Sequence, residues 1–234
     1  RRTLQCVVPS GGGSSVVGGV NPPTEGFCGS VTIDMTKMNK VLEIDATSQA
    51  ARVQAGVLGP DLERQLKASG LTMRFFLQAF EFSSLGGWIA TRAAGHYATV
   101  YSQIDDHVES LRVVTPAGLI ASRRLPTSGA GPNPDRLFLG SEGSLGIITE
   151  AWVRLHRRPT IRLNTTVRFG DYEKAVDAVR AITQSGLYPA NARLIEREEA
   201  LFTEAGDGTA DVLVLSFESA DHPLEPWMDR ALEI

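Results

Sequence analysis

The sequence predicts an α+β protein: a mixed or antiparallel sheet with flanking helices, followed by a second α+β layer domain. Three observations predict this class. Short strand-like runs dominate the first two-thirds of the chain. Helical periodicity becomes frequent after Arg157-Arg158-Pro159, where strands and helices begin to alternate. Three segments rich in glycine and serine interrupt the strand-like runs, which indicates close backbone approaches within the first part.

Length and composition allow one large domain, or one domain and part of another. The chain has 234 residues, and 42% of them are hydrophobic, an ordinary share for a globular core. The net charge is -4 with the signs interspersed, so no basic stripe points to nucleic acid. No apolar run is long enough to span a bilayer, and no signal-peptide pattern precedes the first strand-like segment.

Cysteine and histidine usage argues against a metal site. Cys6 and Cys28 lack the spacing of a metal-binding pair, and the four histidines lack zinc-ligand spacing. Two thiols cannot staple a chain of this size. We therefore expect two reduced, buried thiols in a cytosol-like compartment.

Alternating apolar and polar residues predict the strands of the first part. They are expected at 31–34, 41–44, 51–55, 111–115, 119–122 and 148–155. Gly59-Pro60-Asp61 opens a helix because proline suits the first helical position, and Gly70 suits its end. Pro116-Ala117-Gly118 predicts the turn of a hairpin.

A different pattern begins near residue 159, where we place a domain boundary. Strands are expected at 165–169, 192–195 and 212–217, and helices at 171–185 and 196–205. An apolar stripe from Leu224 to Leu232 predicts a last helix without a stop signal. The first strand-like segment also runs almost directly into a glycine loop. We therefore expect the chain to be a fragment.

The first glycine-rich segment, 9–19, suits a diphosphate. It holds three glycines in a row, Gly11 to Gly13, followed by Ser14 and Ser15. Backbone N–H groups and hydroxyls can all donate to an anion there. Neither the G-x-G-x-x-G nor the G-K-[ST] pattern is present. A plain flexible loop remains the alternative.

The second segment, 81–95, predicts a helix start that a ligand can approach. Ser83 is expected to cap a helix whose first turn is rich in glycine, which leaves N–H groups available. Gly86 and Gly87 would admit a ring or a phosphate. Trp88 is expected to pack in the core rather than stack on a cofactor. Arg92 fits a phosphate partner and an exposed surface charge equally well.

The third segment, 140–149, carries glycines at every third position before a strand-like run. One interpretation is a β-turn that leads into a buried strand. The other is a set of backbone donors facing the polar edge of a flat heterocycle, with aliphatic residues beneath it. Glu142 then either bonds the cofactor or faces solvent.

In this order and spacing, the three segments resemble the flavin-binding domain of the vanillyl-alcohol oxidase/p-cresol methylhydroxylase (PCMH) superfamily. The resemblance covers about residues 6–158. Within the superfamily, 81–93, with its Gly-Gly-Trp and Thr-Arg-Ala, is most similar to the alkyldihydroxyacetonephosphate synthase branch. D-lactate and glycolate oxidase relatives usually carry Gly-Gly-Asn there. Residues 61–67 and 105–109 also suit the synthase branch.

The resemblance implies a PCMH-type FAD-binding domain at 1–158 without its N-terminal subdomain. It also implies the truncated start of a ferredoxin-like cap domain at 159–234. FAD would be bound non-covalently in an extended form, although Gln78 stands where the family often has Asp. The implied cofactor-binding residues are Pro9, Ser10, Gly11, Gly12, Gly13, Ser14, Ser15, Val16, Gln78, Ala79, Phe80, Glu81, Phe82, Ser83, Ser84, Gly86, Gly87, Thr91, Arg92, Ala93, Ala94, Glu142, Gly143, Ser144, Leu145, Gly146, Ile147 and Ile148.

For function, the resemblance implies exchange of an acyl for an alkyl group on acyl-dihydroxyacetone phosphate, through a flavin N5 adduct, in ether lipid synthesis. Arg193 matches a family arginine on the substrate side, where a phosphate needs a cation; a surface salt bridge is its alternative. Catalytic residues are expected in a C-terminal part beyond this chain. Two alternatives remain: an FAD-linked oxidoreductase of 2-hydroxy acids such as D-lactate or glycolate, and a truncated, catalytically incomplete domain.

The resemblance also bears on partners and location. We expect a small-molecule, lipid-type substrate, no nucleic acid and no transmembrane segment, and the resemblance leaves room for a homodimer. Bacterial relatives are cytoplasmic and eukaryotic ones peroxisomal. A cytoplasmic location is therefore expected, or a peroxisomal one in a eukaryote. The last residues, 232–234, carry no peroxisomal address.

Overall fold

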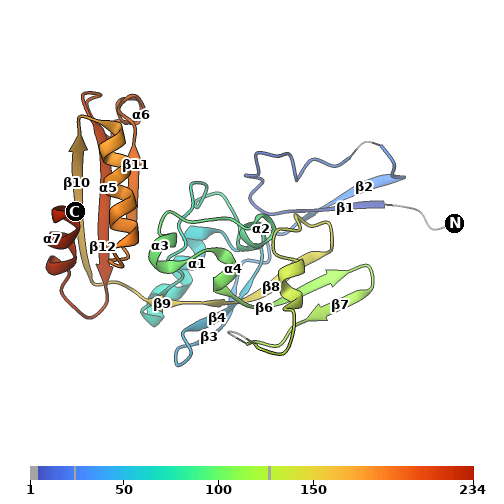
Figure 1. Ribbon diagram of the computed structural model, residues 1–234. Coiled ribbons are helices and arrows are strands. Elements are labelled where there is room, and N and C mark those ends of the chain that lie inside the picture. The colour runs from blue at the N-terminus through green and yellow to red at the C-terminus, as the bar shows by residue number, and fades with distance from the viewer. Residues whose placement is uncertain (1–4, 24, 126–127) are drawn as a thin grey trace. The chain divides into compact units, whose positions relative to one another are not determined.

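The computed structural model describes residues 5–23, 25–125 and 128–234, and it divides into two compact units (Figure 1). The first unit contains the chain up to His96 together with Ser102–Arg157. The second contains Tyr97–Tyr101 and Arg158–Ile234. The division after Arg157 falls next to the boundary that the sequence analysis places near residue 159.

The first unit is built on a five-stranded antiparallel sheet with the order β3-β4-β8-β6-β7. The strands are β3 Val41–Asp45, β4 Ala50–Gln54, β6 Val108–Thr115, β7 Gly118–Ala121 and β8 Ile147–Arg154. In the central strand β8, Ala151 pairs with Val53 of β4 and with Leu111 of β6. The centre of the sheet thus joins the early part of the chain to its middle.

Smaller elements complete this unit. Strand β1 (Gln5–Ser10) pairs in parallel with β2 (Gly29–Asp34), and β5 (Leu71–Thr72) pairs with β9 (His156–Arg157). The helices are α1 Gly59–Leu66, α2 Leu85–Thr91 and α4 Ile104–His107, with 3₁₀ turns η1 Lys67–Ser69 and η2 Pro134–Leu137. A parallel pair needs a long crossover. Residues 11–23 and 25–28 belong to that crossover, and most of the first glycine-rich segment lies in it.

The core of the first unit lies between the five-stranded sheet and α1 and α2. Leu62 and Leu66, four residues apart on α1, both face inward. Trp88 of α2 is 1% exposed and packs against Phe75, with 5.4 Å between ring centroids. The expected core role of Trp88 is therefore confirmed. Gly70 ends the α1–η1 run in the left-handed region, at φ 71°, as glycine allows.

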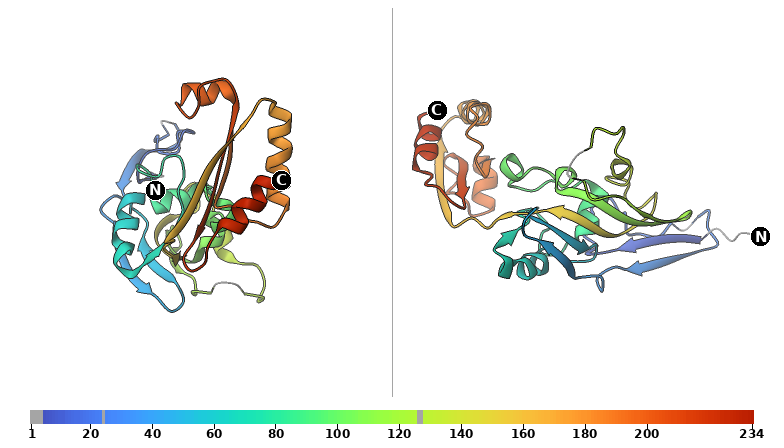
Figure 2. Two further views of the ribbon diagram at one scale, coloured as in Figure 1. Left: turned by 90° about the vertical axis from the view of Figure 1, so that its left-hand side faces the viewer. Right: turned by 90° about the horizontal axis from the view of Figure 1, so that it is seen from below.

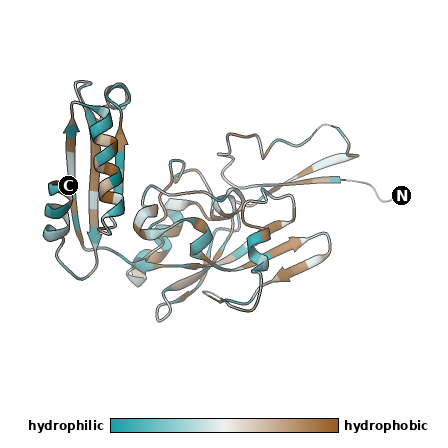
Figure 3. Ribbon diagram, viewed as in Figure 1, coloured by the Kyte–Doolittle hydropathy of each residue, from teal (hydrophilic) through white to brown (hydrophobic). Residues whose placement is uncertain are grey.

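The second unit is a three-stranded antiparallel sheet with the order β10-β12-β11. Its elements are β10 Ile161–Phe169, α5 Tyr172–Gln184, β11 Asn191–Ile195, α6 Arg197–Phe202, β12 Asp211–Ser219 and α7 Glu225–Glu233, and the segment Tyr97–Tyr101 adds α3 Ala98–Tyr101. Helices α5 and α7 cover the same face of the sheet (Figure 2). Ile182 and Met228 pack there with Leu215. Figure 3 shows hydrophobic residues concentrated along β12, the central strand of this sheet.

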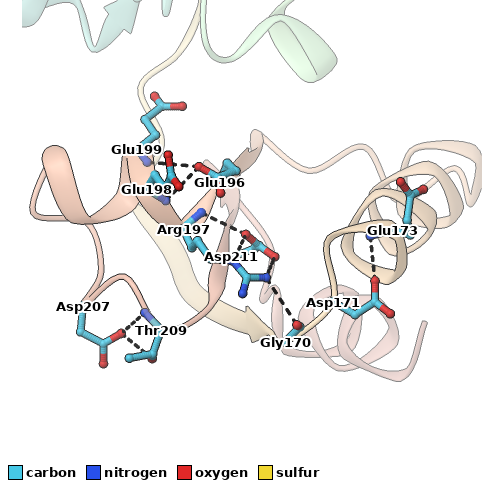
Figure 4. A network of polar contacts seen from close by, with 10 residues as sticks. All are labelled: Gly170, Asp171, Glu173, Glu196, Arg197, Glu198, Glu199, Asp207, Thr209 and Asp211. Atoms are coloured by element: carbon cyan, nitrogen blue, oxygen red, sulfur yellow. Dashed lines mark hydrogen bonds and ion pairs between the residues drawn. The ribbon is translucent and has the colours of Figure 1, made fainter.

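An ion pair with a buried carboxylate fixes α6 to this sheet (Figure 4). Asp211 is fully buried and accepts hydrogen bonds from Arg197, 2.9 Å from Nη2 and 3.0 Å from the backbone N. These bonds lower the pKa of Asp211. Glu196 caps α6 through the backbone N of Glu198, 2.9 Å away. The helix therefore begins at Arg197, and it ends at Phe202, three residues before the predicted end.

The expectation about the two thiols is wrong. Cys28 is exposed and Cys6 only partly buried, so the expected burial of both thiols is wrong: β1 and β2 form a two-stranded ribbon that is mostly open to solvent. Within residues 5–23, 25–125 and 128–234, no group of three metal-ligating side chains could hold an ion. In the same ranges, no helix combines the length and the apolar character that crossing a membrane requires.

Candidate cofactor site

A cavity of about 440 Å³ lies in the first unit, where the three glycine-rich segments meet. Most of the residues expected to bind a cofactor line it. From the expected set these are Pro9, Gly11, Gly12, Gly13, Ser14, Ser15, Val16, Ala79, Ser83, Ser84, Gly86, Gly87, Thr91, Ala93, Glu142, Gly143, Gly146 and Ile148. Segments far apart in the sequence thus form one concave surface.

The first loop docks directly on the second segment. A Cβ on Gly12 would lie 1.5 Å from the carbonyl oxygen of Phe82, and one on Gly11 would lie 2.1 Å from Oγ of Ser84. Only glycine permits this approach, because the neighbour at Gly12 is backbone that a side-chain rotation cannot move. Glycine here brings two walls of the cavity together.

The same loop presents donors to the cavity. The backbone N–H groups of residues 12–16 donate to no acceptor in the described part of the chain. The hydroxyls of Ser14 and Ser15 lie on the same lining. Clustered backbone N–H groups form a concavity that suits an anion such as a diphosphate.

The second segment differs from expectation. Ser84, not Ser83, is the N-cap of α2, and its Oγ accepts from Gly87 N at 3.4 Å. Ser83 Oγ instead accepts from Trp88 Nε1 at 2.7 Å and donates to the carbonyl of Ala79. The chain before α2 runs beside residues 55–58 through a bridge between Leu58 and Ser84. The helix therefore starts one residue later than a cap at Ser83 requires.

The N–H groups expected to be available at the start of α2 are engaged. Leu85 N donates to the carbonyl of Val57 at 3.0 Å, and Gly86 N donates to that of Ala55 at 2.7 Å. A Cβ on Gly86 would lie 2.8 Å from Cβ of Ala55. Gly86 is thus needed for close packing against the end of β4, and the expectation of available donors at this turn is wrong.

The third segment is anchored on the C-terminal end of α2. Gly140 N donates to the carbonyl of Ile89 at 3.1 Å, and Glu142 N donates to that of Ala90 at 2.9 Å. Glu142 has a positive φ of 49°. Gly146 leads into β8, where Ile148 is 8% exposed and supplies aliphatic lining. This loop thus places a carboxylate and an apolar wall on the same cavity.

Several expected residues lie near the cavity without lining it. They are Ser10, Gln78, Phe80, Glu81, Phe82, Arg92, Ala94, Ser144, Leu145 and Ile147. The Arg92 guanidinium bonds the carboxylate of Asp105, 3.3 Å from Nε to Oδ1, and this bond raises the pKa of Arg92. Arg193, expected on the substrate side, lies on β11 of the second unit and pairs with Glu199 at 3.2 Å.

Eight residues that line the cavity are not in the expected cofactor-binding set. They are Val17, Gly19, Val20, Met35, Ala55, Leu77, Trp88 and Ala90. Gly19 belongs to the first glycine-rich segment, so its position was a usable signal. Met35 and Ala55 follow β2 and β4, and no local pattern distinguishes them from other strand ends.

Comparison with known proteins decides the family. Residues 1–122 match the FAD binding domain family. The chain belongs to this FAD-binding family. It is 42% identical to the alkyldihydroxyacetonephosphate synthase of Dictyostelium discoideum, over 82% of this chain and 31% of that protein. It is 36% identical to the synthase of Trypanosoma brucei brucei, over 91% of this chain and 35% of that protein. The chain thus spans about a third of the length of these relatives.

A solved structure of an alkyldihydroxyacetonephosphate synthase matches with a TM-score of 0.88 and 33% identity, over 98% of this chain and 45% of that one. The similarity extends over both units. The predicted α+β class and the PCMH-type FAD-binding domain are confirmed, as is the resemblance to the synthase branch.

The cofactor of this family is FAD, as predicted, and the cavity fits it. The backbone N–H groups of 12–16, which have no acceptor among the described residues, suit its diphosphate. Ala55, Gly86 and Ile148 provide the small and apolar surface that a flat ring requires. Residues 12–16 would therefore hold the diphosphate, and the other two walls would hold the rest of the cofactor.

Proposed function

We propose that the protein carrying this chain is an FAD-dependent synthase that exchanges the acyl group of an acyl-dihydroxyacetone phosphate for the alkyl group of a long-chain alcohol. The observation that carries the proposal is the likeness to alkyldihydroxyacetonephosphate synthases across both units. The segment that separates the synthase branch from its relatives, 81–93, also contributes residues to the lining of the cavity.

In this proposal the residues of the first unit bind and orient the cofactor. The N–H groups of residues 12–16 and the hydroxyls of Ser14 and Ser15 donate hydrogen bonds to the FAD diphosphate and stabilise its negative charge. The loop at 142–146 and Ile148 close the cavity from a second side and reduce the access of water to the ring. When bound, FAD supplies an electron sink for the exchange at the substrate carbon, without net oxidation.

Arg193 is proposed to contribute the cation for the substrate phosphate. In the structure Arg193 forms an ion pair with Glu199. Both side chains are about half exposed, so breaking this ion pair costs little free energy. A guanidinium can bind a phosphate through two parallel hydrogen bonds. The acyl group would leave as a fatty acid, and the alcohol oxygen would take its place on the substrate carbon.

A second candidate is an FAD-linked oxidoreductase of 2-hydroxy acids, in which the flavin accepts a hydride. Two relatives favour it. The chain is 32% identical to the D-lactate dehydrogenase [cytochrome] 1 of Saccharomyces cerevisiae, over 87% of this chain and 34% of that protein. It is also 32% identical to the glycolate oxidase subunit GlcD of Bacillus subtilis, over 97% of this chain and 48% of that protein.

The two candidates separate in one experiment on the purified holoprotein. We expect acyl-dihydroxyacetone phosphate and hexadecanol to yield an ether product that mass spectrometry detects. We expect D-lactate and glycolate to leave the flavin absorbance unchanged under anaerobic conditions. Rapid bleaching by either acid, with no ether product, would favour the oxidoreductase.

We also propose that FAD is non-covalent, so acid-precipitated protein should be colourless.

The role of Arg193 is tested by Arg193→Ala. We expect KM for acyl-dihydroxyacetone phosphate to rise by about 30-fold, since losing a charge-assisted contact costs about 2 kcal/mol. Arg180→Ala is a matched control, because Arg180 also forms an exposed pair, with Asp177. Equal KM values for the two variants would remove Arg193 from the proposal and leave the reaction class untouched.

A further inference from the structure

One buried carboxylate joins three segments beside the FAD cavity. Asp105 of α4 is 8% exposed, and two guanidinium groups bind it. Arg92 contacts it through Nε and Nη2, and Arg136 Nη1 donates to Oδ2 at 2.8 Å. Arg92 is the C-cap of α2, and Arg136 lies in η2. The ends of α2 and η2 are thus held together on α4.

The next residues along both segments enter the cavity wall. Thr91 and Ala93, on either side of Arg92, line the cavity. Beyond η2, the buried side chains of Phe138 and Leu139 lead directly into the loop at 140–146. Asp105 and its two arginines therefore lie next to two of the three segments that line the cavity, namely 91–93 and 140–146.

The Arg92 side chain also packs on the loop itself. A Cβ on Gly140 would lie 2.5 Å from Cδ of Arg92, so the methylene stem of the arginine fills the space that glycine leaves. Gly140 has φ 80°, and its N–H bonds the α2 carbonyl of Ile89. If the stem moved, this contact would open and the loop would lose a support.

Arg92 therefore links Asp105 to the loop at 140–146. Its guanidinium contacts Asp105 through Nε and Nη2, and its stem packs on Gly140. Arg136 lines no part of the cavity. Both arginines remain about half exposed, at 59% and 49%, so water can solvate them when the carboxylate is neutralised.

From this arrangement we propose that Asp105 is a positioning residue for FAD. It holds Arg92 and Arg136 so that the loop at 140–146 stays closed on the cofactor. It acts through these two arginines and contacts neither FAD nor substrate. The inference depends on FAD binding and not on the exchanged group, so a failure of the synthase proposal would leave it intact.

The test compares Asp105→Asn with Asp106→Asn in the purified protein, by titrating stripped apoprotein with FAD and following flavin fluorescence. Asp106 is the adjacent residue, is exposed, and meets Arg136 only at 3.6 Å. We expect the FAD Kd to rise about tenfold for Asp105→Asn, equivalent to about 1.4 kcal/mol, and to stay within about twofold for Asp106→Asn. Asp105→Glu retains the charge and should restore most of the affinity.

Two further measurements separate positioning from general destabilisation. Hydrogen exchange at the backbone N–H groups of Gly140 and Glu142 should accelerate in Asp105→Asn, while exchange in β8 stays unchanged. Arg136→Gln should raise the FAD Kd about threefold even if Asp105→Asn folds poorly. The proposal is overturned if FAD affinity and loop exchange match the wild type in folded Asp105→Asn, or if Arg136→Gln has no effect.

Discussion

The loop at 9–16 and the turn at 83–87 are both rich in glycine and serine, and both line the FAD cavity, yet they use glycine for opposite purposes. In the loop, the N–H groups of residues 12–16 donate to no acceptor within residues 5–23, 25–125 and 128–234. In the turn, the N–H groups of Leu85 and Gly86 are consumed by the carbonyls of Val57 and Ala55. The loop offers donors to a ligand, whereas the turn offers only a close-packed surface.

The difference shows that a glycine-rich segment has no fixed chemical meaning. Glycine lets another part of the chain come close to its backbone. The neighbouring element decides whether that part accepts the N–H groups or leaves them unbonded. Beside the turn lies the segment that follows β4, and its Ala55 and Val57 carbonyls accept the N–H groups. Beside the loop lie the Phe82 carbonyl, which a Cβ on Gly12 would strike, and the Ser84 side chain, which a Cβ on Gly11 would strike. Neither accepts the N–H groups of residues 12–16, all of which line the cavity.

The largest effect should come from Gly12→Ala. Its Cβ would collide with the carbonyl of Phe82, so the loop must move and its donors with it. We expect the FAD Kd to rise by about 100-fold or more, equivalent to about 2.8 kcal/mol. Gly13→Ala is the control: φ is 66° but no atom lies within 4 Å, so only the backbone cost of about 1 kcal/mol applies. Titration of both apoproteins with FAD measures the contrast, and equal affinities would mean that the loop is not a cradle.

A smaller effect, on stability rather than on ligand affinity, is expected at the turn. Gly86→Ala places a methyl group against Ala55 and should lower the free energy of unfolding of the apoprotein by about 2 kcal/mol. The methyl group of Gly87→Ala would meet only Ser84 Oγ, at 3.4 Å. This substitution should raise the free energy of unfolding by about 0.5 kcal/mol, since alanine favours helix. Urea unfolding of the apoproteins reports the two signs. A destabilised Gly87→Ala would show that the turn is tighter than these contacts indicate.

The smallest contrast separates the two serines of the turn. Ser83→Ala removes the acceptor of the buried Trp88 Nε1 and should cost about 2 kcal/mol of stability. Ser84→Ala removes a helix cap whose hydrogen bond is long, 3.4 Å, and should cost about 1 kcal/mol or less. Thermal unfolding of both variants ranks them. The reverse order would mean that the helix cap contributes more to stability than the hydrogen bond to Trp88.

Much of the fold was predictable because its signals are local. The hairpin of β6 and β7 follows from Pro116-Ala117-Gly118, and α1 follows from Pro60 and its spaced leucines. The core position of Trp88 was also correct. The helix cap was misassigned by one residue, since Ser83 and Ser84 are both good caps and only the bridge to Leu58 selects the second. Arg92 was ambiguous because its partner, Asp105, lies on another element.

The sequence by itself determined where small residues, strand alternation and helix starts occur, because these depend on side chains within a few positions of one another. It therefore indicated the three segments that line the cavity of the first unit. Only the tertiary structure decided which backbone N–H groups donate to protein carbonyls and which are left for a ligand. It also decided which carboxylate binds Arg92. These outcomes depend on acceptors from distant parts of the chain, and no local sequence pattern shows which acceptor will lie close to which donor.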